Sequence, residues 1–261
     1  MSLIPSNDNI EQIAALIVER RIKGSQGESF PEHLRPQTIE DALAIQQEVT
    51  KRWCDSQDDL VGGWKCLEPS SSATVIAPIY ARTINSVAPV PIFAENGVAR
   101  IEPELAFFVG EDLPARDEPY TEQEIDAVFT RAHMALELLH CRFLTPEACS
   151  FPEKLADGLV NQGLFIGPQV PLAQAKAAAT IAISVTVNGI TTTYAGAHPN
   201  GDPVKPLYWL VEFLRGRGLG LEKGQAIITG SFAGVIEVPF GKDVKVVYDG
   251  LGEMQVHFTQ K

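Results

Sequence analysis

The sequence predicts an α+β chain in which a helical N-terminal region rests on a β-rich core. Helical hydrophobic spacing dominates the first third of the 261 residues, whereas apolar runs typical of strands collect after residue 98. Hydrophobic residues make up 45% of the chain, which is enough for a sizeable core. We therefore predict a helical or mixed region over residues 1–97 and a β-rich core over residues 98–261.

Four segments have the hydrophobic spacing or the capping residues of a helix. Residues 10–18 place apolar side chains at helical spacing, and Gly24 can end that helix. A threonine is expected to cap each of two further helices, over 38–53 and 121–129. A last helix is predicted over 206–214, because its leucines and its valine fall on one face.

Strands are predicted where apolar residues run densely or alternate with polar ones. One pair, 181–187 and 190–194, is joined by Asn188-Gly189, which favours a type I′ hairpin turn. The other predicted strands cover residues 104–109, 132–139, 163–166, 226–229, 244–248 and 254–258.

The charge balance limits the partners of the chain. The 33 acidic residues exceed the 21 basic ones, giving a net charge of −12, so nucleic acid and anionic membrane surfaces are not expected as ligands. No apolar run approaches the length of ~20 residues that a membrane-spanning helix needs. Residues 1–10 lack the basic start of a secretory signal, and the 4 cysteines form no C-x-x-C pair. We therefore expect a cytoplasmic protein with free thiols.

Three glutamates are the most informative residues. Glu102 and Glu104 stand two positions apart where the chain is expected to enter a strand, so both face one side and repel each other. Glu137 lies in an almost wholly apolar strand, where an unpaired carboxylate is costly. A divalent cation would relieve both penalties, and ligands that offer only oxygen select a hard ion such as Mg²⁺, Mn²⁺ or Ca²⁺.

Simpler interpretations stay open for these glutamates. Glu102 and Glu104 could lie on a solvated sheet edge, and Glu137 could pair with Arg142 or with another cation. Lys65 stands in an apolar, glycine-containing segment, where a partly desolvated amine can have a depressed pKa and transfer protons. The alternative is a surface lysine whose ammonium group extends into solvent.

Two polar loops complete the candidate site. Asp157, Asn161 and Gln162 lead directly into a predicted strand, a common place for groups that bind ligands. The loop 229–234, which contains Ser231, is rich in small residues, and its backbone N–H groups could hold a carboxylate. A plain turn is the alternative for the first loop, and loops rich in small residues, such as the second, are frequent in proteins.

Taken in order, these segments resemble the fumarylacetoacetate hydrolase superfamily, and within it the 2-keto-4-pentenoate hydratase / 4-oxalocrotonate decarboxylase family. The resemblance covers most of the chain. It depends chiefly on the motifs Gly63-Trp-Lys65, Ile101-Glu-Pro-Glu-Leu105, Ala135-Leu-Glu-Leu138, Ala156-Asp157 and Ile228-Thr-Gly-Ser231.

The resemblance implies a mixed β-roll core, which would make residues 98–261 the catalytic core. It implies Mg²⁺ or Mn²⁺ bound by Glu102, Glu104 and Glu137, a small 2-oxo acid chelated by the metal, and Lys65 as the group that transfers protons. It also implies a homo-oligomer, in some relatives associated with a neighbouring pathway enzyme.

The chain departs from the family pattern around the proton-transfer groups. The segment 72–80 carries no carboxylate, where the hydratases usually have an aspartate. The Asp-Asn-Ala-Ser loop of the family is here Asp157-Gly-Leu-Val160, so its asparagine and serine are absent, and Asn161 and Gln162 are the candidate substitutes.

The sequence therefore predicts a divalent-metal-dependent lyase, a hydratase or decarboxylase in the catabolism of aromatic compounds. Lys65 is the predicted catalytic residue, and the predicted substrate-binding residues are Asp157, Asn161, Gln162 and Ser231. The first alternative is an acylpyruvate-type carbon–carbon bond hydrolase, for which His33 with a nearby glutamate could activate water. The second is a non-catalytic, metal-bound member of the family.

Overall fold

The computed structural model describes residues 7–70 and 73–261. The predictions made for residues 1–10 and 72–80 therefore lie partly outside the described residues. Among the described residues, no helix is both long enough and apolar enough to cross a membrane. The described helices are α1 (Asn7–Lys23), α2 (Ile39–Gln57), α3 (Glu122–Val128), α4 (Phe151–Ala156), α5 (Leu172–Lys176) and α6 (Lys205–Arg215), with short 3₁₀ helices η1 (Glu32–Leu34), η2 (Ala81–Thr83) and η3 (Pro146–Ala148).

Capping residues set the helix starts as the sequence predicts. The side chain of Thr38 accepts a hydrogen bond from the Asp41 N–H, and the Asp41 carboxylate accepts one in return from the Thr38 N–H. Thr121 and Glu124 form the same reciprocal pair at the start of α3. Phe129, predicted as the end of that helix, instead begins a strand, because its backbone is extended and it pairs with the preceding strand.

The larger sheet contains the strands that carry the candidate site. Its order is β2 (Ile76–Tyr80), β1 (Val61–Cys66), β10 (Ala226–Ile228), β5 (Val98–Val109), β6 (Phe129–Leu139), β7 (Asn161–Val170) and β3 (Ile84–Asn85), with β11 (Ile236–Pro239) pairing with the start of β5. The second sheet has the order β4 (Val90–Ile92), β13 (Gly252–Gln260), β12 (Asp243–Tyr248), β8 (Thr180–Val187) and β9 (Ile190–Ala197).

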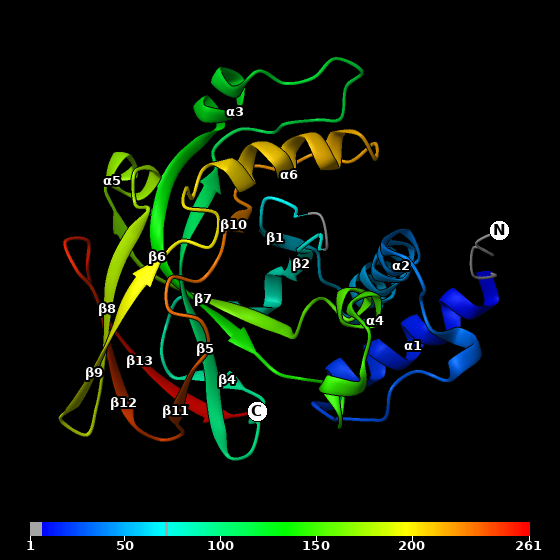
Figure 1. The fold of residues 1–261 in the computed structure, drawn as a ribbon, viewed down its shortest axis with the longest axis horizontal. Helices are drawn as coiled ribbons and strands as arrows, with labels where there is room; N and C mark the ends of the chain where they lie inside the picture. Colours follow the sequence, from blue (N-terminus) through cyan, green and yellow to red (C-terminus); the bar gives the residue numbers. More distant parts are fainter. Residues whose placement is uncertain (1–6, 71–72) are drawn as a thin grey trace.

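The α+β class with an N-terminal helical region is confirmed. Helices α1, α2 and α4 lie together at one side of the molecule, and the second sheet lies at the opposite side (Figure 1). The predicted hairpin turn is also confirmed, since Asn188 and Gly189 both have the positive φ that a type I′ turn requires.

Strands before residue 98 are the main feature absent from the sequence prediction. Strand β1 contains two glycines and a lysine, so it lacks a strand pattern, and it pairs in parallel with β10 from the far end of the chain. The first predicted region thus contributes β1 and β2 to the sheet built on β5, β6 and β7. The division at residues 97 and 98 stays a prediction.

Tyr248 joins the two sheets. Its side chain leaves β12 and is fully buried, and its hydroxyl lies 2.7 Å from the Ala135 carbonyl oxygen and 3.1 Å from that of Glu104. Burial raises the pKa of this hydroxyl well above its usual range, so it remains a donor. The second sheet therefore supports β5 and β6 at the positions from which the glutamate side chains project.

Candidate active site

Three glutamate side chains converge on the face shared by β5 and β6. The antiparallel register places Glu102 directly opposite Glu137, and Glu104 two positions along on the same face. Each of the three offers a carboxylate oxygen, and these oxygens all lie within 4.8 Å of one another. Like charges directly opposite each other destabilise a sheet, so this register needs a compensating charge.

The solvated-edge alternative is excluded by burial. Glu104 is 2% exposed and Glu137 is 0% exposed, while Glu102 is half-buried. Glu102 and Glu104 also lie well inside β5, which begins at Val98, whereas the sequence placed them at the entrance of a strand. The strand starts earlier than predicted because residues 98–101 pair with β11, a contact that local sequence does not reveal.

Burial and repulsion by a neighbouring carboxylate both act against ionisation of Glu102 and Glu104. Burial, followed by the charge of Glu137, raises the pKa of Glu102 to about 7. The same two causes raise the pKa of Glu104 well above its usual range, opposed by the Gly230 N–H, which donates a hydrogen bond to Glu104 Oε2 at 2.7 Å.

Lys65 supplies the nearest positive charge. Its Nζ lies 2.6 Å and 2.8 Å from the two carboxylate oxygens of Glu137 and 3.4 Å from the Leu159 carbonyl oxygen. The cation that pairs with Glu137 is thus Lys65, and Arg142 pairs with Asp157 instead. The predicted depressed pKa is wrong for this arrangement: burial lowers the pKa of Lys65, but the carboxylates of Glu137 and Glu102 raise it by more.

The three glutamates, together with Lys65, fit a hard divalent cation. With all groups ionised, three carboxylates and one ammonium group leave a net charge of −2, which one divalent ion would balance. The donors are oxygen atoms only, the set that Mg²⁺, Mn²⁺ and Ca²⁺ prefer. The buried, mutually repelling carboxylates are the structural observation that supports such an ion.

The loop before β7 contributes one side chain directly to this cluster. Asn161 is buried, and its Nδ2 donates a hydrogen bond to Glu137 Oε1 at 2.8 Å. Asp157 is also buried, but its Oδ1 accepts a hydrogen bond from Arg142 Nε at 2.6 Å. The structure therefore places Asn161 beside the glutamates and Asp157 in an ion pair behind the loop.

The other two predicted side chains bind backbone groups. Gln162 donates to the carbonyl oxygens of Phe93 and Leu139 and accepts from the Phe93 N–H. The hydroxyl of Ser231 lies 3.3 Å from the Pro103 carbonyl oxygen. In the neighbouring position, the Gly230 N–H holds a carboxylate as predicted for this loop, but the carboxylate is that of Glu104.

Two arginines lie behind the loop: sequence reasoning missed Arg21, and it considered Arg142 only as a possible partner of Glu137. Both are buried, and both donate hydrogen bonds to the Asp157 carbonyl oxygen. The detectable signal for Arg21 was its place on the apolar face of the first helix, where a charged residue needs a partner.

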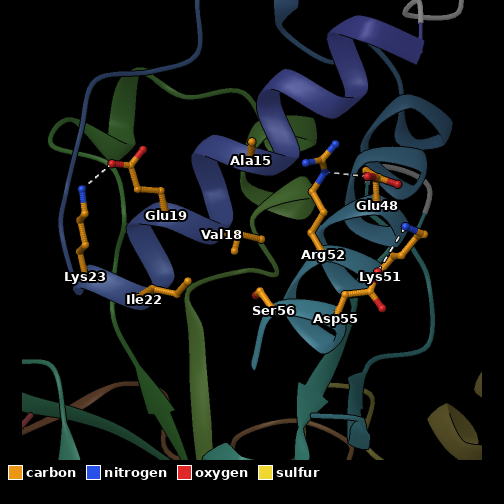
Figure 2. Close-up of a pocket in the computed structure, with 10 residues that line it drawn as sticks. All are labelled: Ala15, Val18, Glu19, Ile22, Lys23, Glu48, Lys51, Arg52, Asp55 and Ser56. Atoms are coloured by element: carbon orange, nitrogen blue, oxygen red, sulfur yellow. Dashed lines mark hydrogen bonds and ion pairs between the residues drawn. The ribbon is translucent and has the colours of Figure 1, made fainter. Parts of the chain in front are cut away.

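A charged groove between α1 and α2 lies apart from the glutamates. It has a volume of about 630 Å³, and its charged side chains pair with neighbours on their own helix, as Figure 2 shows for Lys23 with Glu19 and for Arg52 with Glu48. Because these charges are already balanced, the groove is not the site we assign to an anionic substrate.

Comparison with known proteins identifies chains of similar sequence and fold. No family model matches the chain. One relative, 2-oxo-hept-4-ene-1,7-dioate hydratase of Escherichia coli, is 26% identical over 241 residues, which cover 85% of this chain and 87% of the relative.

Solved structures share the fold. The 4-oxalocrotonate decarboxylase from Pseudomonas putida G7, complexed with calcium and acetate, superposes with a TM-score of 0.76 at 19% identity over 97% of this chain and 98% of that one. A second structure of that decarboxylase contains magnesium and adipate. A protein from Yersinia pestis assigned to the fumarylacetoacetate hydrolase family superposes with a TM-score of 0.54 at 20% identity over 77% and 94% of the two chains. The resemblance predicted from the sequence is confirmed, since the chain shares its fold with the decarboxylase and with the protein assigned to the fumarylacetoacetate hydrolase family.

Proposed function

We propose that this protein is a divalent-metal-dependent lyase that acts on a small 2-oxo (2-hydroxydienoic) acid. The reaction is a hydration of the 2-keto-4-pentenoate type or a related decarboxylation. The observation that carries the proposal is the convergence of three buried carboxylates on one point beside Lys65. The relative that is a hydratase and the decarboxylase that shares the fold support the reaction class.

Glu102, Glu104 and Glu137 are the residues that would hold Mg²⁺ or Mn²⁺. When bound, the ion supplies Lewis-acid polarisation of the 2-oxo and carboxylate oxygens of the substrate. The protein surface is strongly acidic, with a net charge of −12, so an anionic substrate needs a local positive charge to be received. In this proposal Lys65 provides part of that charge.

Lys65 would transfer the proton to or from the carbon chain of the substrate. Its side chain is only 11% exposed, so water competes little for its ammonium group. Glu137 and the Leu159 carbonyl oxygen orient the amine, and Asn161 holds the Glu137 carboxylate from the other side. The segment 73–80 contains no carboxylate that could serve as a second acid or base.

Hydration and decarboxylation share this proton transfer and differ in the bond that changes. A hydratase adds water across a carbon–carbon double bond, whereas a decarboxylase breaks the bond to a carboxylate and releases carbon dioxide. Hydrolysis of an acylpyruvate needs an activated water instead, and the histidine considered for that role, His33, is exposed on η1.

Product analysis tests the proposal. We would incubate the purified protein with a panel of 2-oxo and 2-hydroxydienoic acids and Mg²⁺, and follow products by NMR and by carbon dioxide release. A metal-free reaction and the Glu104→Gln variant serve as controls. We expect hydration or decarboxylation by the wild-type protein with Mg²⁺, and loss of the reaction both without the metal and in Glu104→Gln. Release of two acids from an acylpyruvate would indicate a hydrolase, and absence of turnover across the panel would indicate a non-catalytic protein.

A further inference from the structure

The turn between α4 and β7 has an unusual backbone. Gly158, Leu159 and Val160 follow one another with φ values of 79°, 52° and 61°, all in the left-handed region. Glycine adopts this region freely, but leucine and especially the β-branched valine do so rarely. Such a turn persists only where its surroundings hold it in place.

Arg21 spans this turn from the end of α1. Its Nη2 donates a hydrogen bond to the Asp157 carbonyl oxygen at 2.5 Å, and its Nη1 donates to the Asn161 carbonyl oxygen at 3.2 Å. The two acceptors flank the three left-handed residues, so one planar guanidinium fixes both ends of the turn. A side chain at position 158 would meet Arg21 Nη2 at 2.6 Å, so the close approach of Arg21 requires glycine there.

Arg142 holds the same turn from the loop after β6. Its Nε donates to Asp157 Oδ1 at 2.6 Å, and its Nη2 donates to the Asp157 carbonyl oxygen at 2.9 Å. Both groups of this pair are at least 98% buried. The His140 N–H adds a third restraint, because it donates to the Val160 carbonyl oxygen at 2.8 Å.

The held turn contacts both members of the Lys65–Glu137 pair. The Leu159 carbonyl oxygen lies 3.4 Å from Lys65 Nζ, and Asn161, the residue after the turn, donates to Glu137 Oε1. The backbone of the turn therefore contacts Lys65, and the side chain that follows the turn contacts Glu137.

We propose that Arg21 and Arg142 are positioning residues that clamp the left-handed turn Gly158–Val160 and thereby fix Lys65 and Glu137 in their relative orientation. The consequence for catalysis rests on the proposed function, whereas the clamp itself does not. The clamp acts through the turn, because the hydrogen bonds of both arginines described above end on Asp157 and Asn161.

Arg20 provides a matched control. Arg20 and Arg21 are adjacent in the same helix, and each residue is 8% exposed. The hydrogen bond from Arg20 to Glu28 is partly buried, whereas both hydrogen bonds of Arg21 are buried. Its hydrogen bonds go to the carbonyl oxygens of Arg142 and Glu28 and not to the turn. An effect that the loss of any buried arginine in α1 would cause should therefore also appear in Arg20→Lys, whereas an effect specific to the clamp should appear only in the Arg21 and Arg142 variants.

Hydrogen exchange and lysine labelling test the clamp without any substrate. Arg21→Lys and Arg142→Lys keep the buried positive charge but lose the planar guanidinium that donates two hydrogen bonds. In both variants we expect the backbone amides of residues 156–162 to exchange at least about tenfold faster than in the wild type. We also expect Lys65 to react faster with an amine-acylating reagent, read by peptide mass spectrometry. Exchange in β12 and β13 reports global unfolding and should stay at the wild-type rate, as should all readouts in Arg20→Lys.

A catalytic readout then separates the two proposals. Exchange of the C3 protons of pyruvate in heavy water with Mg²⁺ reports proton transfer, and we expect Arg21→Lys to lower its kcat by about 10- to 100-fold with little change in KM. Equal exchange and labelling in the Arg20 and Arg21 variants would overturn the clamp. Failure of the wild-type protein to exchange pyruvate protons would count against the proposed function, while the substrate-free readouts would still decide the clamp.

Discussion

The ammonium group of Lys65 lies 2.6 Å from the carboxylate of Glu137, although 72 positions separate the two residues in sequence. Lys65 is on β1 and Glu137 on β6, and the strands β10 and β5 lie between them in the sheet. In a flat sheet three strand spacings of ~4.8 Å would hold β1 and β6 about 14 Å apart. The side chains of Lys65 and Glu137 therefore reach each other across β10 and β5, on the face that carries the glutamates.

Replacing Lys65 is expected to abolish proton transfer and to destabilise the fold. Lys65→Met keeps the aliphatic stem but leaves Glu137, which is 0% exposed, without its cation. Removal of one partner from a buried pair costs about 3–5 kcal/mol. Urea denaturation measures the loss of stability, and pyruvate proton exchange measures the loss of activity.

The double variant Lys65→Met/Glu137→Gln separates these two effects. It removes both charges, so we expect most of the stability to return while the activity stays absent. An active double variant would show that Lys65 does not transfer the proton. If the double variant is as unstable as Lys65→Met, the unpaired charge of Glu137 is not the cause of the lost stability.

Tyr248→Phe is expected to weaken the link between the two sheets. The change removes the hydroxyl that bonds the Ala135 carbonyl oxygen at 2.7 Å, behind the glutamate-bearing strands. Loss of such a buried hydrogen bond costs about 1–2 kcal/mol in the free energy of unfolding. Urea denaturation measures the change, with the half-buried Tyr194→Phe of the second sheet as the control. Equal midpoints for the two variants would contradict this role.

His140 is expected to make stability depend on pH. Burial, and then the charge of Arg142, lower the pKa of His140 from 6.5 to about 4. The unfolded chain therefore binds the proton more readily, so the contribution of His140 is fully present above pH 6.5 and is lost as pH falls toward 4. The loss amounts to up to about 3 kcal/mol.

Denaturation curves between pH 4 and pH 7.5 check this contribution. His140→Gln cannot titrate at this position, so its stability should fall less steeply than that of the wild type over the acid range. His257→Gln, at a half-buried histidine that pairs with Asp243, is the control and should follow the wild type. Parallel curves for the wild type and His140→Gln would rule out the effect.

The parts of the fold that follow from local sequence were predicted well. The caps at Thr38 and Thr121 and the Asn188-Gly189 turn are specified by neighbouring residues, and each forms as expected. Strand β1 was missed because it is stabilised by β10 and not by its own pattern. Sequence periodicity cannot show such a distant pairing.

In the candidate site, too, some residues could be predicted from local sequence, whereas others depend on distant contacts. The spacing of Glu102 and Glu104 fixes their common face, and the apolar setting of Glu137 signals an unusual carboxylate, so these residues could be found from the sequence. The partner of Lys65 could not, and the sign of its pKa shift depends on that partner. The roles of Arg21 and Arg142 depend on backbone carbonyls, which carry no sequence signature.

Calorimetric titration of Mg²⁺ and Mn²⁺ into the metal-free protein tests the central claim most directly. Glu104→Ala removes one carboxylate of the cluster, and Glu153→Ala removes an equally buried carboxylate that lies in the α4 cap, each glutamate being 2% exposed. We predict one divalent ion bound per chain in the wild type and in Glu153→Ala, and binding weakened beyond detection in Glu104→Ala. Unchanged binding in Glu104→Ala, or no binding in the wild type, would contradict the metal assignment.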